Sequence, residues 1–194
     1  SIDIPEGLRD VIGKRLSHLS AQCNRVLRAA AVIGQTFRLD VLHQVADISE
    51  DDLFATLEEA KAVAVLDEHH SVGAVPSFSF THAFFRQTLY EENITPRRIR
   101  LHQQVGRAIE VIQAGRLDEH ATELAVHFAN SSDPEDLAKA LRYSERAAKN
   151  AIGVYAYAEG VRLREHALQV HEVLGPEDNA KHCDLLIELG NVLL

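Results

Sequence analysis

Apolar residues recur every three or four positions along nearly the whole chain, and no other feature of the sequence restricts its fold so strongly. This spacing is that of an amphipathic α-helix, which buries one stripe of its side chains. Helices are predicted over residues of about 8–19, 20–33, 38–46, 48–63, 82–92, 96–113, 118–130, 135–151, 155–174 and 178–194. The chain is therefore expected to be mainly α.

One interruption breaks the helical pattern. The segments AVLDEH (64–69) and SFSF (77–80) resemble two short strands joined by a turn that contains Gly73 and Pro76. Helices followed by a two-stranded wing are the element order of a winged helix. A winged-helix domain is therefore predicted over residues 20–94.

The helices after residue 95 are separated by short breaks, which is typical of stacked antiparallel hairpins. KALRYSERAA (139–148) and EGVRLREHAL (159–168) both place small residues seven positions apart. Small residues let helices approach closely, as in tetratricopeptide-like repeats. An α-helical tetratricopeptide-like hairpin array over 95–194 is therefore predicted, with a generic helical bundle as the alternative.

The array predicts which of its residues are buried. The residues expected to be buried are Leu141, Ala147, Val161, Ala167 and Leu168, and those expected to be exposed are Arg142, Glu145, Arg162 and Glu165. The last helix, 178–194, carries an apolar face of Leu185, Leu186, Leu189 and Leu193. If the array is truncated there, this face is uncovered, and self-association through it is expected.

Composition excludes several classes of protein. Charged residues make up 25% of the chain, which is ordinary for a folded domain. We find no apolar run of the ~20 residues that a membrane span needs, and no signal-peptide pattern at the start. Two cysteines are too few for a disulfide framework, so a reduced, cytoplasmic protein is expected.

Candidate catalytic and metal-binding motifs fail on their spacing. GLRDVIGKR (7–15) misses the phosphate-binding P-loop pattern, because its glycines are wrongly spaced and Arg15 replaces the required hydroxyl. In HATELAVH, His120 and His127 are seven residues apart, which strains joint ligation of one ion. His69 and His70 would point to opposite faces of a strand. Neither a catalytic site nor a metal site is therefore predicted.

Winged helices often bind DNA through a basic third helix in the major groove. Here that helix carries Glu50, Asp51, Asp52, Glu58 and Glu59 against a single Lys61, and the whole chain has a net charge of −9. Phosphates would repel such a helix. No direct contact with nucleic acid is expected, although a DNA-binding transcriptional regulator remains the alternative function.

The segment FSFTHAFFRQTLYEE (78–92) places a histidine where the second strand gives way to a helix. Thr81 is expected to cap this helix, which puts His82 in its first turn. A neutral imidazole beside free amides suits an anion such as a phosphate, and Arg86 lies one turn on. The structural alternative is a histidine that bonds a nearby carbonyl, with Arg86 packed over Tyr90.

A basic turn follows at TPRRIRLHQQ (95–104). Arg97, Arg98 and Arg100 lie at a helix start, where the dipole disfavours cations. At least one is expected to pair with an acidic group of the winged helix or of an upstream domain, as an interdomain contact. The alternative is a solvated basic patch.

Four segments in order resemble one protein family. They are IPEGLRDVIGKRLSHLS, AAVIGQTF, FTHAFFRQTLY with RRIRLH, and DLAKALRYSERAA. Together they are similar to the region that follows the ATPase module in bacterial STAND-class signalling ATPases, including large LuxR-type regulators and relatives fused to adenylate or guanylate cyclase domains. The family's Met-His-Asp signature reads Thr81-His82-Ala83 here.

The resemblance implies a function. Residues 1–19 would be a linker helix from an upstream ATPase domain that binds ATP or ADP with Mg, and His82 would contact the terminal phosphate of that nucleotide. The repeats would bind a protein or small-molecule effector, and the output domain, transcriptional or cyclase, would lie outside the chain. The chain itself would be a non-catalytic regulatory fragment.

Overall fold

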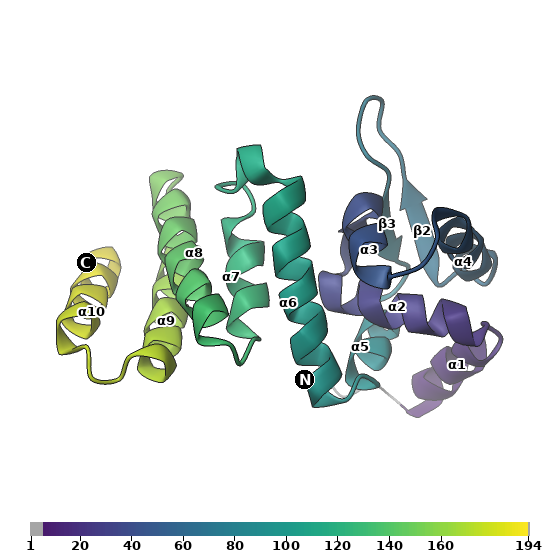
Figure 1. Cartoon of the computed structure of the whole chain (residues 1–194), viewed down its shortest axis with the longest axis horizontal. Coiled ribbons are helices and arrows are strands. Elements are labelled where there is room, and N and C mark those ends of the chain that lie inside the picture. Colours follow the sequence, from purple (N-terminus) through teal and green to yellow (C-terminus); the bar gives the residue numbers. More distant parts are fainter. Residues whose placement is uncertain (1–5, 194) are drawn as a thin grey trace. The chain divides into compact units, whose positions relative to one another are not determined.

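The computed structural model describes residues 6–193, with side chains from Asp10 onward. Within that range it is mainly helical, with ten α-helices and one small antiparallel sheet (Figure 1). The chain divides into two compact units, an N-terminal unit that ends at Leu101 and a C-terminal unit that begins at His102.

The N-terminal unit follows the predicted order of elements. Its elements are α1 (Glu6–Ser17), α2 (Ala21–Ile33), β1 (Thr36–Arg38), α3 (Leu39–Ala46), α4 (Glu50–Ala62), β2 (Leu66–His69), β3 (Ser77–Phe80), α5 (Ala83–Glu91) and the first turns of α6 (Thr95–Ile112). Residues 1–5 of the predicted linker lie outside the described residues. The segment GLRDVIGKR lies within α1 and not in a loop.

The sheet has three strands where the sequence predicted two. β3 lies in the centre and pairs antiparallel with β1 and β2, with Phe37 opposite Phe78 and Leu66 opposite Phe80. β1 was missed because three residues are too short to display an alternation of apolar and polar positions. Its pairing depends on β3, which lies about forty residues further along the chain.

Between β2 and β3 the chain forms a long loop that extends away from the helices of this unit (Figure 1). Gly73 supplies the positive φ of 76° that the turn requires. Val72 at the loop tip is 99% exposed.

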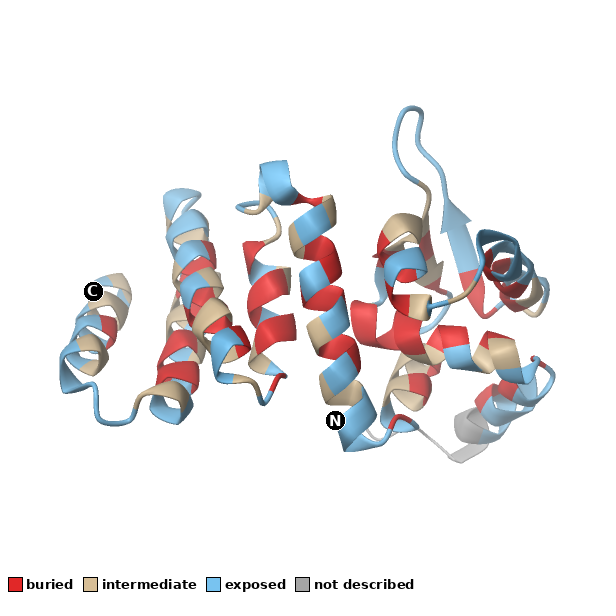
Figure 2. Cartoon of the chain, viewed as in Figure 1, coloured by how far each residue is buried: buried red, intermediate tan, exposed pale blue. Residues whose placement is uncertain are grey.

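The core of the N-terminal unit forms around α2, which contacts α3, α4, α5 and β1. Cys23, Leu27 and Ala30 of α2 are fully buried, and Figure 2 shows long buried stretches along this helix. Phe37, Phe78 and Phe80 close the core from the sheet, and the ring centroid of Phe37 lies 6.1 Å from that of Phe78 and 5.8 Å from that of Phe80. Burial raises the pKa of the Cys23 thiol to about 12, with a smaller contribution from Glu59, so Cys23 is a packing residue.

Polar contacts join α1 to this core. Ser20 caps α2 as predicted, by accepting a hydrogen bond from the Cys23 amide, and Glu59 of α4 accepts from both the backbone and the hydroxyl of Ser20. The Asn24 side chain donates to the carbonyls of Leu16 and Leu19. The orientation of α1 is therefore set by hydrogen bonds as well as by its buried apolar face.

The C-terminal unit is entirely helical over the residues that the structure describes. After the rest of α6 come a 3-10 turn (Ala114–Arg116), α7 (Ala121–Ala129), α8 (Pro134–Gly153), α9 (Tyr157–Leu174) and α10 (Asn179–Leu193). Consecutive helices contact each other from α7 to α10. All four lie within a few residues of their predicted ranges.

Most of the predicted burial in these helices is confirmed. Leu141, Ala147, Ala167 and Leu168 are buried, whereas Val161 is only half-buried. Among the residues predicted to be exposed, only Glu145 is half-buried, because it pairs with Lys181 of α10. Spacing within a helix identifies the buried stripe but not the ion pairs that cross to the next helix.

The last helix is only partly covered, as Figure 2 shows. Leu185 is buried against the rest of the unit, Leu189 is half-buried, and Leu186 and Leu193 are exposed. Two of the four leucines predicted to form an uncovered face are therefore exposed. Self-association through them stays a prediction.

We predict that Gly106 is required for the packing of α6 in the C-terminal unit. A Cβ at this position would lie 2.9 Å from two ring carbons of Phe128, which is fully buried. Gly106→Ala should therefore lower the melting temperature, because overpacking costs about 1–3 kcal/mol and outweighs the gain in helix propensity. Gly190→Ala is the matched control: its Cβ meets no atom within 4 Å, so it should raise stability by about 0.5–1 kcal/mol. Equal effects of the two substitutions would contradict this packing.

A second prediction concerns His166 of α9, whose Nδ1 lies 2.8 Å from the Ser144 hydroxyl. Burial, with a smaller contribution from Arg162, lowers the pKa of His166 from its ordinary 6.5. The unfolded chain then binds this proton more readily, so the stabilising contribution is present above pH 6.5 and is lost as the pH falls below it. His166→Gln should reduce the loss of melting temperature between neutral and acidic pH, whereas His43→Gln, at an exposed position, should leave it unchanged. If the melting temperature of His166→Gln falls as much between neutral and acidic pH as that of the unmodified chain, the prediction is wrong.

Candidate functional site at the start of α5

The junction of β3 and α5 has a different cap from the predicted one. Thr81 does not cap α5: its hydroxyl donates to the carbonyl oxygens of Ala64, at 2.9 Å, and Val65, at 3.4 Å. His82 is the N-cap, and its Nδ1 accepts a hydrogen bond of 3.3 Å from the Phe84 amide. His82 therefore precedes the helix instead of lying in its first turn, and the imidazole bonds an amide, not a carbonyl.

The hydrogen bond to Phe84 determines the tautomer of His82. Because Nδ1 accepts, it carries no proton in the neutral ring, and the proton is on Nε2. The ring stacks on Phe84 with centroids 4.8 Å apart, and the residue is exposed. His82 thus presents an oriented N–H donor at the surface, the form that can donate to an anionic oxygen.

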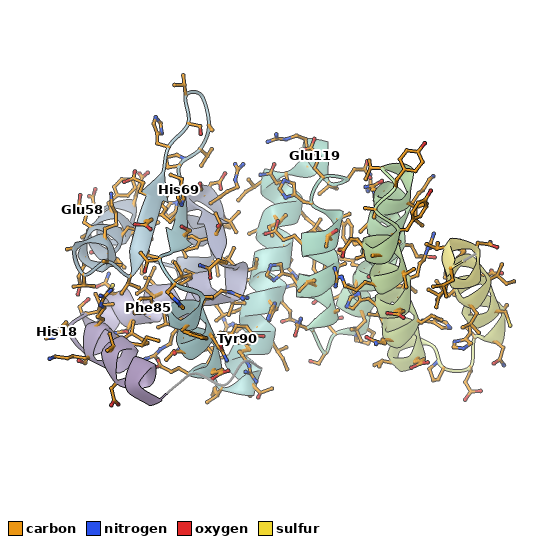
Figure 3. All side chains as sticks on the ribbon, turned by 180° about the vertical axis from the view of Figure 1, so that it is seen from behind. His18, Glu58, His69, Phe85, Tyr90 and Glu119 are labelled. Atoms are coloured by element: carbon orange, nitrogen blue, oxygen red, sulfur yellow. The ribbon has the colours of Figure 1, made fainter. Side chains whose placement is uncertain are left out.

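Arg86 is engaged within the unit. Its Nε donates to the Ala31 carbonyl of α2 at 3.1 Å, and its guanidinium carbon lies 5.9 Å from the centre of the Tyr90 ring. Packing over Tyr90 was one of the two alternatives from the sequence. Figure 3 shows Tyr90 and Phe85 on α5. Arg86 therefore stabilises the contact between α2 and α5, and any contact with a phosphate stays a prediction.

Ala64 supports the junction in a way that the sequence did not suggest. It has a positive φ of 53°, which is unusual for alanine, and it lies between α4 and β2. Its carbonyl accepts from the Thr81 hydroxyl and, at 3.3 Å, from Nη1 of Arg15 on α1. The guanidinium of Arg15 also lies over the Phe85 ring. Residues 64–65 therefore hold Thr81 just before His82, and Arg15 joins α1 to the same carbonyl.

The basic turn lies at the start of α6. Arg97 and Arg100 are exposed, and Arg98 is half-buried, with a hydrogen bond to the Thr95 hydroxyl and its guanidinium 5.3 Å from the centre of the Tyr90 ring. Among the side chains described, no acid forms an ion pair with any of the three. A contact with an upstream domain stays a prediction.

The histidines of the C-terminal unit pair in a way that the sequence did not predict. His120 bonds Glu123 at 3.1 Å, while His127 is buried and its Nδ1 lies 2.9 Å from Nδ1 of His102. His102 is on α6, so only the packing of α7 on α6 brings this pair together. From Asp10 to Leu193, the structure contains no cluster of three or more residues that could hold a metal ion.

An open groove of about 800 Å³ lies in the C-terminal unit. Its lining includes Asp118, Glu119, Lys149 and Val154, and the exposed Tyr155 follows Val154 with a positive φ of 62°. A positive φ is rare for an aromatic residue, so this turn is a strained segment beside a concave surface.

Comparison of the chain with protein-family models, with curated proteins and with solved structures gives no match. Within residues 6–193, no helix combines the length and the apolar character that crossing a membrane would require.

We predict that His82 contributes to stability through its cap. His82→Ala should lower the free energy of unfolding by about 0.5–1 kcal/mol, at the low end for an N-cap because the hydrogen bond is long. His82→Asn should leave stability within a few tenths of a kcal/mol, because asparagine is a strong N-cap. Urea unfolding of both variants measures the difference, and equal losses would show that the ring contributes by stacking on Phe84.

Proposed function

We propose that this chain is a non-catalytic regulatory and interaction module of a STAND-type signal-transducing ATPase. In this proposal the N-terminal unit is a winged helix and the C-terminal unit is a tetratricopeptide-like array. The order of helices, sheet and helical hairpins supports this interpretation. The module couples the nucleotide state of an upstream ATPase domain to an effector and to an output domain outside the chain.

The observation that carries the proposal is the state of His82. A cap bond from the Phe84 amide holds the ring at the surface with its proton on Nε2. A fixed donor of this kind suits the terminal phosphate of ADP on a neighbouring domain, because a hydrogen bond to a charged group contributes about 1.5–3 kcal/mol. Such a bond would favour the resting, closed arrangement of the two domains.

The groove of the C-terminal unit is the proposed position of the effector. It offers charged groups beside an apolar wall, the usual combination in a ligand site. The chemistry of its lining fits a polar small molecule or a peptide of a protein effector.

Two other functions stay as alternatives. A DNA-binding regulator would use α4, but Glu50, Asp51 and Asp52 are exposed at the start of that helix, which disfavours contact with phosphates. The regulatory part of an adenylate or guanylate cyclase would differ only in its output domain. A gel-shift assay at several salt concentrations tests the first alternative, and the coding sequence of the parent protein tests the second.

The test of the proposed function uses the parent protein, in which a Walker motif should be encoded upstream of Ser1. His82→Asn keeps the cap and removes the Nε2 donor, so ADP affinity should fall roughly ten- to a hundredfold and basal output should rise. Isothermal titration of ADP measures the affinity. His43→Asn, at an exposed histidine on α3, is the control and should bind ADP normally. Unchanged ADP affinity in His82→Asn would leave His82 as a structural cap.

A further inference from the structure

Two arginines share one tyrosine ring at the junction of α5 and α6. The guanidinium carbons of Arg86 and Arg98 lie 5.9 and 5.3 Å from the centre of the Tyr90 ring. Arg97 and Arg100 flank Arg98 on the first turns of α6. We name these four arginines together with Tyr90 the arginine surface; all of it belongs to the N-terminal unit.

The described acids at the end of α5 are engaged with residues outside the arginine surface. Of the two glutamates at the end of α5, Glu91 accepts a hydrogen bond from Gln87, and Glu92 pairs with Arg28 at 3.1 Å. Across the described side chains, no ion pair includes any arginine of this surface. The N-terminal end of α6 adds its own positive potential. Four arginines on α5 and the first turns of α6 therefore have no acidic partner among the described side chains, in a chain of net charge −9.

Two of these guanidinium groups are held in place before any partner arrives. Arg98 donates to the Thr95 hydroxyl at 3.2 Å, and Arg86 donates to the Ala31 carbonyl at 3.1 Å. The cation–π contact of each guanidinium group with Tyr90 restricts it further. Fixed side chains lose little conformational entropy when they bind a partner. These two arginines are therefore better suited to binding than arginines that only keep a surface soluble.

We propose that the arginine surface binds an acidic segment of a protein partner, with guanidinium groups paired to its carboxylates. A guanidinium fork matches a carboxylate in two parallel hydrogen bonds. A nucleic acid fits less well, because its continuous phosphates would run beyond this small surface onto a chain with an excess of acids. Discrete carboxylates on a peptide can instead meet the arginines and avoid Glu91 and Glu92.

The inference deepens the proposed interaction role, and it rests on that role only for the identity of the partner. The arginine test below measures peptide binding by the 194-residue chain, whereas the His82 test measures ADP binding by the parent protein. If one of these two proposals fails its test, the result for the other proposal can still be interpreted.

The experiment titrates the chain into a fluorescein-labelled peptide of ten glutamates and follows the anisotropy at low and at physiological salt. The unmodified chain should bind, more weakly as salt rises. Arg98→Glu and the double variant Arg97→Glu/Arg100→Glu should each weaken binding by roughly tenfold or more. Arg98→Lys keeps the charge but loses the guanidinium fork that can pair with a carboxylate in two hydrogen bonds, so its loss of affinity should be smaller than that of Arg98→Glu. Arg142→Glu, the same change at an exposed arginine of α8, is the control and should bind nearly normally.

Three outcomes would overturn the proposal. They are the absence of peptide binding by the unmodified chain, equal weakening by Arg142→Glu, and tighter binding of a ten-nucleotide single-stranded DNA with the same dependence on Arg98. The last outcome would identify a nucleic-acid surface. Circular dichroism establishes that each variant is folded, and the double variant changes only exposed residues, so the test does not depend on Arg98→Glu alone.

Discussion

The burial of α2 is the constraint on which the N-terminal unit depends. Its alanines and its apolar side chains pack against α3, α4, α5 and β1, so the removal of this helix from water fixes the positions of all four. The same packing places the Ala31 carbonyl where Arg86 can bond it, which joins α2 to α5. The orientation of His82 at the start of α5 thus follows from a core in which His82 itself takes no part.

The C-terminal unit depends on close helix contact. Gly106 lets α6 approach Phe128, and Gly160 lies against Ile152, so small residues set the distances between neighbouring helices. Polar groups are buried where the helices meet: Asp136 accepts from Ser131, and His102 pairs with His127. Such groups are tolerated in a core because each has a partner.

Charge is distributed unevenly in the N-terminal unit. The acids of α4 and the arginines at the start of α6 give this unit surfaces of opposite sign, although the chain as a whole is acidic. Acids at the first turn of α4 suit the helix dipole, whereas arginines at the first turns of α6 oppose it. An arrangement that costs stability locally is expected where binding of a partner compensates for it, as we propose for the arginine surface.

Periodicity by itself determined the helices of this chain, because each is long enough to display a repeating apolar stripe. It also located β2 and β3, and most of the buried residues of α8 and α9. Tertiary structure alone decided the rest. β1 is too short to be recognised without its partner β3. Thr81 does not cap α5, because its hydroxyl donates a hydrogen bond to the Ala64 carbonyl, and His82 is the N-cap instead. The contact of Arg98 with the Tyr90 ring likewise exists only because a turn after α5 brings the start of α6 back beside that ring, a contact between segments that local spacing does not encode. The contact of Arg86 with the same ring is local, because the two residues are four apart on α5.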